Sequence, residues 1–319
     1  MTGATGKVGN AVARALAARG DDVVALVRDP AAALPDGVRA VRGDVTDAAT
    51  LPPAVAGCEL VFNAMGIPEQ WLADEGAFER VNARGTDAVV RAAVAAGARR
   101  VVHTSTIDVF HAGRGEHFDE SSLATYPKGT AYERSKQEAE GLALAAASGD
   151  TEVVMVNPAA VYGLGPLASP SFERDLFEPI VRKRRLALPA LPPGGCGMVF
   201  SEGVALGHLL AAEHGRPGER YILCDRHASL KALAEIVVQV AGRGFVPPVM
   251  PEPVAGALAA LGEPIARVVG GPPLLPRGQH HFFRWNAAPD SGRAQDELGW
   301  EPTPLEQGLR ETLAAMDLA

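Results

Sequence analysis

Three side chains of this sequence have the types and the spacing needed for proton transfer at a substrate oxygen. Tyr132 and Lys136 stand four residues apart at the start of a predicted helix, so both project from one helix face. A phenol with a pKa of about 10 exchanges protons poorly at neutral pH, and a neighbouring ammonium lowers that pKa. Thr106, at the end of a predicted strand, adds a hydroxyl that can hydrogen-bond the same oxygen. The three groups suit proton exchange with a carbonyl or alcohol while hydride moves between its carbon and a nicotinamide.

The Tyr-x-x-x-Lys pattern is frequent by chance, so an exposed pair on a helix surface is the alternative interpretation. The elements that would position the pair decide between the two. Five apolar runs alternate with helical segments over the first half of the chain, which predicts an α/β, Rossmann-type doubly wound parallel sheet with right-handed crossovers. The runs lie at residues 22–27, 38–45, 58–66, 100–106 and 152–158, with helices expected at 11–18, 77–96 and 137–147.

The chain opens with glycines at positions 3, 6 and 9, directly before an alanine-rich helical run. Such a turn lets the backbone approach a pyrophosphate, while free N–H groups and the positive end of the helix dipole hold the anion. A glycine-rich turn that caps an ordinary helix is the alternative. Only Met1 and Thr2 precede Gly3, although a dinucleotide fold needs an apolar strand there. We therefore expect a largely missing first strand, and a mis-set start or a truncation is the simplest explanation.

Two further residues concern the adenosine end of a dinucleotide. Arg28 follows the 22–27 run, where an acidic residue would bind ribose hydroxyls and an arginine suits a 2′-phosphate. Arg28 therefore favours NADP(H) over NAD(H), and a solvated loop arginine beside Asp29 is the alternative. Asp44 ends the next run and is placed to face an adenine amino group. The small residues Ala64 and Gly66 close the third run, where a dinucleotide would cross the sheet.

The amino-acid composition of the sequence changes after Pro158. Residues 159–198 are rich in Pro, Gly and Arg, whereas the 199–214 run and the strand at 220–224 indicate a return to the sheet. Residues 244–280 are apolar and interrupted by Pro and Gly, which suits a small substrate-covering lobe. We predict a nucleotide-binding domain at 1–158, to which 199–225 returns. The predicted substrate lobe comprises 159–198 and 226–319.

The composition limits the classes of molecule that this protein is expected to bind. The 319 residues are 47% hydrophobic and 21% charged, as in ordinary globular proteins. A net charge of −8 argues against nucleic acid or an anionic membrane as the main partner. Cys58, Cys196 and Cys224 show no disulfide or metal spacing, and neither a signal peptide nor a membrane-length apolar run is found. We expect a cytoplasmic protein that acts on a small molecule.

Taken in chain order, these motifs strongly resemble the extended short-chain dehydrogenase/reductase superfamily, that is, the NAD-dependent epimerase/dehydratase family. Residues 2–9 resemble its nucleotide fingerprint, and Val81-Asn82-Ala83-Arg84-Gly85-Thr86 resembles its fourth-helix motif. Residues 156–163 and 215–223 are similar to the dihydroflavonol-reductase-like branch, which includes hopanoid-associated epimerase-like proteins. The resemblance covers nearly the whole chain.

The resemblance implies roles for individual residues. Thr106, Tyr132 and Lys136 would form the catalytic triad, and Lys136 would also hold the nicotinamide ribose. Asp44 and Val45 would contact adenine, and Pro158 to Val161 would lie against the nicotinamide. The family also implies a homodimer. The expected coenzyme-binding residues are Gly3, Thr5, Gly6, Lys7, Val8, Gly9, Arg28, Asp44, Val45, Ala64, Met65, Gly66, Asn82, Thr104, Tyr132, Lys136, Pro158 and Val161.

With Arg28, the Asn157-Pro158 pair favours an NADP(H)-dependent oxidoreductase that acts on a ketone or a secondary alcohol, since nucleotide-sugar epimerases more often carry Arg where Asn157 stands. NAD(H) remains an alternative coenzyme. A nucleotide-sugar epimerase or dehydratase with a recycled NAD(P) is the second hypothesis, and a non-catalytic NADP(H)-binding regulator is the third. Segments 67–78, 108–130 and 159–280 would form the pocket. No residue pattern in them identifies the substrate.

Some positions depart from the family pattern. Thr106 replaces the commoner Ser but keeps a hydroxyl, and Ser201–Ala205 replaces an Asp-rich segment near the expected hinge. Residues 107–110 lack the usual Tyr-Gly ending, which is expected to reshape the substrate side. The basic run at 182–185 suits either an anionic ligand or a solvated helix end, and the second is the safer interpretation. His280 and His281 have no third ligand at a recognisable spacing, so no metal is expected.

Overall fold

The structure is a computed structural model that describes residues 1–167, 171–184 and 186–319. Its larger sheet holds four parallel strands in the order β3-β4-β6-β9: β3 (Leu60–Asn63), β4 (Arg100–Thr104), β6 (Glu152–Pro158) and β9 (Arg220–Leu223). A second parallel pair consists of β1 (Val23–Val27) and β2 (Val38–Arg42). Strands β1 and β4 are buried at every position, as expected of parallel strands covered on both faces.

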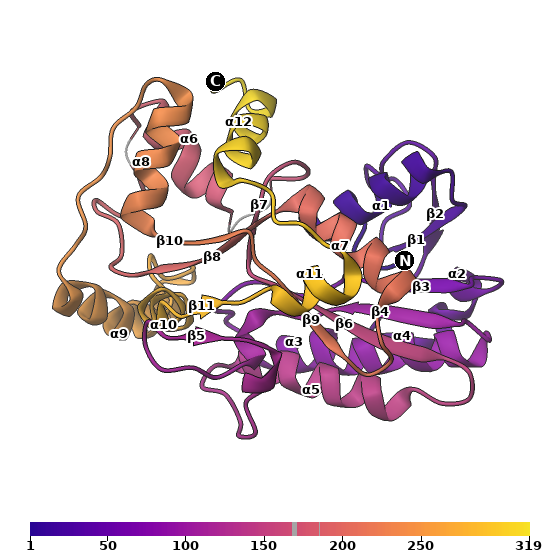
Figure 1. Cartoon of the computed structure of the whole chain (residues 1–319). Helices are drawn as coiled ribbons and strands as arrows, with labels where there is room; N and C mark the ends of the chain where they lie inside the picture. Colours follow the sequence, from indigo (N-terminus) through magenta and orange to yellow (C-terminus); the bar gives the residue numbers. More distant parts are fainter. Residues whose placement is uncertain (168–170, 185) are drawn as a thin grey trace.

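Helices cover both faces of these strands (Figure 1). Helices α1 (Lys7–Arg19) and α7 (Ser201–His214) pack against each other on one face. Helices α4 (Gly85–Ala95) and α5 (Ala131–Ala146) pack together on the other face, with the short α2 (Pro52–Val55) and α3 (Gly76–Phe78) beside them. This arrangement confirms the predicted α/β, Rossmann-type doubly wound architecture.

Met1 and Thr2 occupy the place between β1 and β3. The Thr2 N–H donates to the Phe62 carbonyl at 2.9 Å, and the Leu26 N–H donates to the Met1 carbonyl at 2.9 Å. Thr2 forms a single parallel bridge with Asn63. Two residues thus link the two-stranded and four-stranded sheets, and the prediction of a largely missing first strand is confirmed.

A second sheet, of three strands, is built from residues after β6. In it β8 (Gly195–Phe200) lies between β7 (Ala160–Tyr162), which is parallel, and β10 (Arg226–Ser229), which is antiparallel. Around it pack α6 (Glu178–Val181), α8 (Leu230–Ala241) and α12 (Leu305–Ala315). The remaining elements are β5 (His117–Phe118), α9 (Glu252–Val269), α10 (Arg277–Trp285), β11 (Ala288–Pro289) and α11 (Gly292–Leu298).

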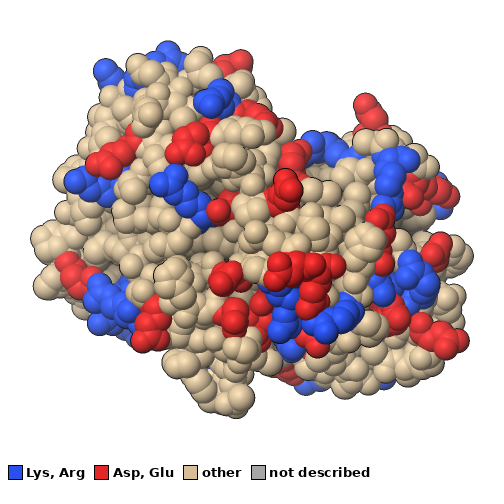
Figure 2. Space-filling model, viewed as in Figure 1, with Lys and Arg blue, Asp and Glu red and all other residues tan. Residues whose placement is uncertain are grey.

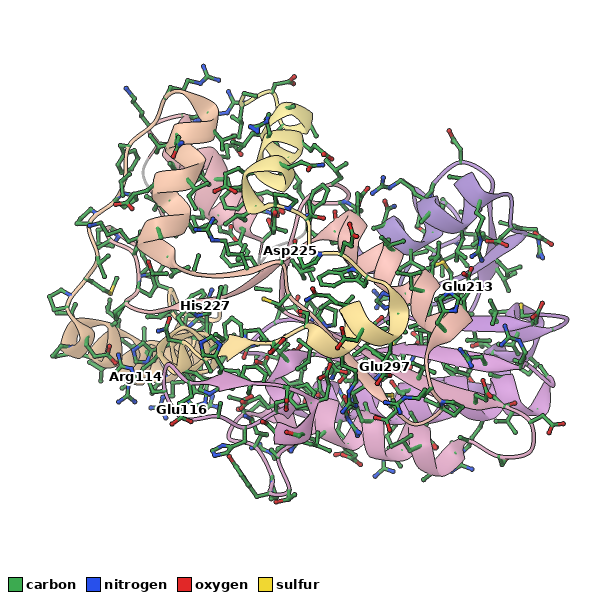
Figure 3. All side chains as sticks on the ribbon, in the orientation of Figure 1. Arg114, Glu116, Glu213, Asp225, His227 and Glu297 are labelled. Carbon is green, nitrogen blue, oxygen red and sulfur yellow. The ribbon has the colours of Figure 1, made fainter. Side chains whose placement is uncertain are left out.

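Asp225 joins this sheet to the C-terminal segment (Figure 3). Its carboxylate accepts the backbone N–H groups of Phe200 at 2.6 Å and of Thr303 at 2.9 Å. Burial nevertheless raises the Asp225 pKa to about 6. These contacts fix the chain where β10 begins, directly after Asp225.

One predicted boundary is wrong. Helix α5 begins at Ala131 rather than at residue 137, because Thr130 and Glu133 form a capping box at its start. The helix expected at 77–96 is a continuous helical segment made of α3, a π-helical turn (Glu79–Arg84) and α4. The apolar region 244–280 contains the 18-residue α9, which has Pro253 in its first turn, where proline costs no hydrogen bond, and Pro264 in its interior.

The face drawn in Figure 2 carries acidic side chains interspersed with basic ones rather than a continuous basic surface. Arg216 and Glu297 form one such pair, and Arg293 and Glu219 form another at 2.6 Å. Among the described helices, none combines the length and the apolar character that crossing a bilayer would require.

Gly9 is predicted to be intolerant of a side chain. A Cβ at Gly9 would lie 2.1 Å from the Gly3 carbonyl oxygen, so Gly9→Ala should lower the free energy of unfolding by about 1–3 kcal/mol through overpacking. Gly141→Ala is the matched control, because a Cβ on that exposed face of α5 meets nothing within 4 Å. It should raise stability by about 0.5–1 kcal/mol through reduced backbone entropy of the unfolded chain. Urea unfolding of both variants measures the difference, and equal stabilities would contradict this packing.

Candidate active site

The glycine turn leads directly into α1 and leaves its first N–H groups available. Gly3 has a positive φ of 75°, and a Cβ there would lie 2.4 Å from the Ala64 carbonyl oxygen. The Gly6 N–H donates to the Gly3 carbonyl at 2.9 Å, which closes the turn. Gly6 is the N-cap of α1, and no side chain caps the helix there. An uncapped helix N-terminus approached by bare backbone is suited to an anion such as a pyrophosphate.

Lys7 turns away from this helix end. Its ammonium donates to the Gly163 carbonyl at 3.0 Å and lies 3.2 Å from the carboxylate of Glu173, which is fully buried. Glu173 also accepts the Gly163 N–H at 2.6 Å. The Lys7 side chain therefore joins the glycine turn to the segment after β7. Thr5 is exposed, whereas Val8 is half-buried in α1.

Arg28 and Asp44 follow neighbouring parallel strands, β1 and β2. Asp44 accepts the backbone N–H of Thr46 at 2.9 Å and its hydroxyl at 2.8 Å. These bonds lower the Asp44 pKa, and the charge of nearby Arg28 lowers it further. Arg28 is exposed, so its guanidinium can reach a ligand at this edge.

The residues after β3 are tied to α5 by one buried amide. Asn82 accepts the Ile67 N–H at 2.8 Å and donates to the Ser135 hydroxyl at 3.0 Å. These bonds occupy the Asn82 side chain, which therefore positions the Ala64–Gly66 segment beside α5. Met65 and Val45 both pack against Gly85, where a Cβ would lie 2.9 Å from a Val45 methyl group.

Thr106 and Tyr132 come together as predicted from their positions at a strand end and a helix start. The Thr106 side chain lies close enough to Tyr132 to act on the phenol, and its effect is to lower the phenol pKa. The Asn157 amide donates to the Thr106 carbonyl at 3.0 Å, which fixes this strand end. Phe78 packs edge-on against the Tyr132 ring, with centroids 6.1 Å apart.

The net pKa shift of Tyr132 is opposite to the one expected from Lys136. Burial raises the Tyr132 pKa above that of a free phenol, and the nearby charge of Asp108 adds to the rise. The free protein therefore holds Tyr132 in its protonated form, as a proton donor.

Lys136 lies deeper along the same helix. Its ammonium donates to the Thr104 carbonyl at 2.8 Å, and burial lowers its pKa to about 8 while the charge of Glu140 opposes that shift. A Cβ at Gly66 would lie 3.9 Å from the Lys136 nitrogen, so the ammonium faces the segment after β3. The Thr104 hydroxyl lies 2.7 Å from His208, so Thr104 meets Lys136 through its backbone carbonyl.

Pro158 and Val161 lie at and just after the end of β6. Pro158 is the last residue of β6 and pairs with Leu223, and Val161 lies in β7 opposite Val199. The predicted residues thus follow the carboxyl ends of the parallel strands, where doubly wound sheets bind dinucleotides.

Sequence reasoning missed two features of this site. Asn157 served only as a family marker, yet its amide connects Thr106 to the buried carboxylate of Glu140 at 2.9 Å, which in turn pairs with Arg220 at 2.7 Å. Asp108 was noted only within a segment that lacks Tyr-Gly, yet it lies beside Tyr132. Its position two residues after Thr106 was the available signal.

Comparison with known proteins agrees with this geometry. The model of the NAD dependent epimerase/dehydratase family matches residues 1–224. The chain is 30% identical to a putative dihydroflavonol 4-reductase of Synechocystis sp. over 98% of this chain and 92% of that protein. It is 32% identical to the 4-hydroxy-2-methyl-3-oxo-4-farnesyl-3,4-dihydroquinoline-1-oxide ketoreductase of Stigmatella aurantiaca, with 84% and 80% covered.

A solved structure of MoeE5 in complex with UDP-glucose and NAD has the same fold, with a TM-score of 0.79 at 22% identity over 100% of this chain and 98% of that one. The uncapped glycine turn, the parallel strand ends and the Thr106–Tyr132–Lys136 group thus occur in a chain that matches one family model over most of its length. The chain belongs to the NAD dependent epimerase/dehydratase family of extended short-chain dehydrogenase/reductase enzymes.

Proposed function

We propose that this enzyme is an NADP(H)-dependent oxidoreductase that reduces a ketone, or oxidises the corresponding secondary alcohol, with Tyr132 as the general acid or base. The proximity of Thr106 to Tyr132, with Lys136 one turn further along α5, carries the proposal. Two relatives whose names describe reductases, one of them a ketoreductase, support the reaction type.

Each residue then has a defined task. When bound, the reduced nicotinamide supplies hydride to the carbonyl carbon. Thr106 holds the carbonyl oxygen by a hydrogen bond, and Tyr132 donates its proton to that oxygen as negative charge develops there. The raised Tyr132 pKa keeps this proton in place before reaction. Lys136 binds the coenzyme ribose and stabilises the phenolate left after transfer.

The coenzyme is proposed to be NADP(H) because Arg28 lies exposed at the adenosine end, next to Asp44. The turn formed by Gly3, Gly6 and Gly9 would hold the pyrophosphate. The other coenzyme contacts predicted from the sequence, among them Val45, Ala64 and Val161, are part of the same proposal. A homodimer in the cytoplasm, where Cys58, Cys196 and Cys224 stay reduced, completes the proposal; all three are free thiols.

Epimerisation or dehydration of a nucleotide-linked sugar is the second candidate, because the family model is named for both reactions. The two candidates differ in their net redox balance. Ketone reduction consumes one NADPH per product, whereas epimerisation recycles a bound NAD(P) and leaves the total absorbance at 340 nm unchanged.

Replacement of the phenol should abolish turnover and spare coenzyme binding. Tyr132→Phe removes the proton donor, so ketone-dependent oxidation of NADPH should fall by about 10²–10⁴-fold. The Kd for NADPH, measured by its fluorescence, should stay within a few-fold. Tyr126→Phe is the matched control, because Tyr126 is exposed and bonds His111 rather than Thr106. Equal turnover by wild type and Tyr132→Phe would refute the assigned chemistry.

Coenzyme preference should depend on Arg28. Arg28→Gln removes a charge-assisted contact to the 2′-phosphate worth about 1.5–3 kcal/mol, so the Kd for NADPH should rise by about 10–150-fold. The Kd for NADH should hardly change, since NADH has no such phosphate. Arg39→Gln is the control. Arg39 is an exposed residue of β2, so this change should alter neither Kd. An Arg28→Gln variant that binds both coenzymes as wild type does would remove the case for NADP(H).

A further inference from the structure

Lys128 is a buried cation that no step of the proposed reaction uses. It is only 9% exposed, although lysine is almost never buried without a partner. Two hydrogen bonds join its backbone to the helix that follows. The Lys128 N–H donates to the Gln137 side chain at 2.9 Å, and the Lys128 carbonyl accepts the Arg134 guanidinium at 3.2 Å. The Lys128 backbone is therefore fixed to the first two turns of α5.

The Lys128 ammonium contacts groups from three parts of the chain. It donates to the Phe110 carbonyl at 2.7 Å, four residues after Thr106, and it lies 3.6 Å from the Glu133 carboxylate. It also lies over the Trp285 ring of α10, with the nitrogen 5.2 Å from the ring centroid, which is a cation–π contact. An ammonium has three N–H donors and no acceptor. A carbonyl, a carboxylate and a ring face therefore occupy it together.

Phe110 and Glu133 each fix one side of the proposed site. Phe110 ends the 3₁₀ turn that follows Thr106, where its N–H donates to the Ile107 carbonyl at 3.1 Å. Glu133 directly follows Tyr132, and the carboxylate oxygen that does not face the ammonium belongs to the capping box that begins α5. One buried ammonium thus joins the segment that carries Thr106 to the helix start that carries Tyr132.

Trp285 closes this contact from the side of α10. Its indole N–H donates to the Ala112 carbonyl at 2.8 Å, and its ring stacks on Phe118 with the ring centroids 4.9 Å apart. Ala112 and Phe118 both belong to the segment just after Phe110. A charged contact that is kept from water is stronger than the same contact on the surface. The buried Lys128 ammonium is therefore a firmer link than a solvated ion pair, which contributes little.

We propose that Lys128 is a positioning residue: its ammonium holds the turn after Thr106 against the start of α5, so that the Thr106 and Tyr132 side chains meet at one substrate oxygen. Its effect on turnover rests on the proposed ketone reduction, whereas the link itself is measured without a substrate. In this role Lys128 acts through Phe110 and Glu133, and it transfers no proton.

Hydrogen exchange tests the link directly. Lys128→Met replaces the ammonium by an apolar side chain of similar length, so both joined segments should open more easily. Amides in peptides covering 106–111 and 129–136 should exchange about 10–150-fold faster, the range for loss of a hydrogen bond to a charged group. Peptides from the glycine turn and α1 should exchange as in wild type. Lys231→Met is the matched control, because Lys231 is exposed and lies 3.7 Å from Glu235 on the surface of α8.

Turnover separates positioning from charge balance. Lys128→Met leaves the buried Glu133 carboxylate without its cation, which is destabilising in itself. Lys128→Met/Glu133→Gln removes both charges and keeps a glutamine that can complete the capping box. Its stability in urea should recover toward that of wild type. Its kcat for uncharged ketones such as cyclohexanone and acetophenone should stay about 10²-fold low, the loss expected when a reacting group is misplaced by about 1 Å. The Kd for NADPH should not change.

Glu133→Gln alone should keep kcat near that of wild type, because Lys128 still bonds the Phe110 carbonyl. A double variant with the kcat of wild type would show that only charge balance matters and would overturn the inference. Unchanged exchange of both segments in Lys128→Met would overturn it as well. If wild type binds NADPH and reduces no ketone while Lys128→Met still exchanges faster in both segments, the proposed function fails and the link stands.

Discussion

The meeting of Thr106 and Tyr132 is the constraint on which the proposed site depends. Thr106 directly follows the strand end of β4 and Tyr132 lies in the first turn of α5, so a strand end and a helix start must come together. Several buried polar contacts hold them in place. Asn157 anchors the Thr106 backbone, and Asn82 holds Ser135, one turn along α5, to the segment after β3. The capping box of Thr130 and Glu133 sets where the helix begins. In the proposed reaction, side chains fixed in this way would hold one substrate oxygen without rearrangement.

Close contacts also fix the glycine turn formed by Gly3, Gly6 and Gly9. Gly3 crosses so close to Ala64 that no side chain fits between them, and Gly9 in α1 lies against Gly3. The glycine turn is thereby fixed relative to the strand end that leads to Gly66 and Lys136. Lys7 contacts Gly163 and Glu173 and so connects the turn to the segment after β7 as well. Coenzyme and substrate would therefore meet at one place, along the carboxyl ends of the parallel strands.

Much of this arrangement could be predicted from local patterns. The apolar runs identify the parallel strands, and the four-residue spacing places Tyr132 and Lys136 on one helix face. Local patterns do not report burial by distant segments, and the errors follow from that. The ammonium of Lys136 was expected to lower the Tyr132 pKa, but burial and Asp108 raise it. Asp108 was overlooked although it follows Thr106 by two residues, because the groups that act on it, such as Lys128 and Glu133, come from a later part of the chain. Asn82 stays a predicted coenzyme contact, and local patterns did not show that its amide also bonds Ile67 and Ser135.

A crystal structure of the complex with NADP⁺ tests the central claim most directly. The account predicts that the nicotinamide C4 atom faces the space between the Thr106 and Tyr132 hydroxyls, with the ribose hydroxyls on Lys136 and the pyrophosphate over the glycine turn. A nicotinamide ring bound away from those hydroxyls, or a Tyr132 hydroxyl that points away from the ring, would contradict it.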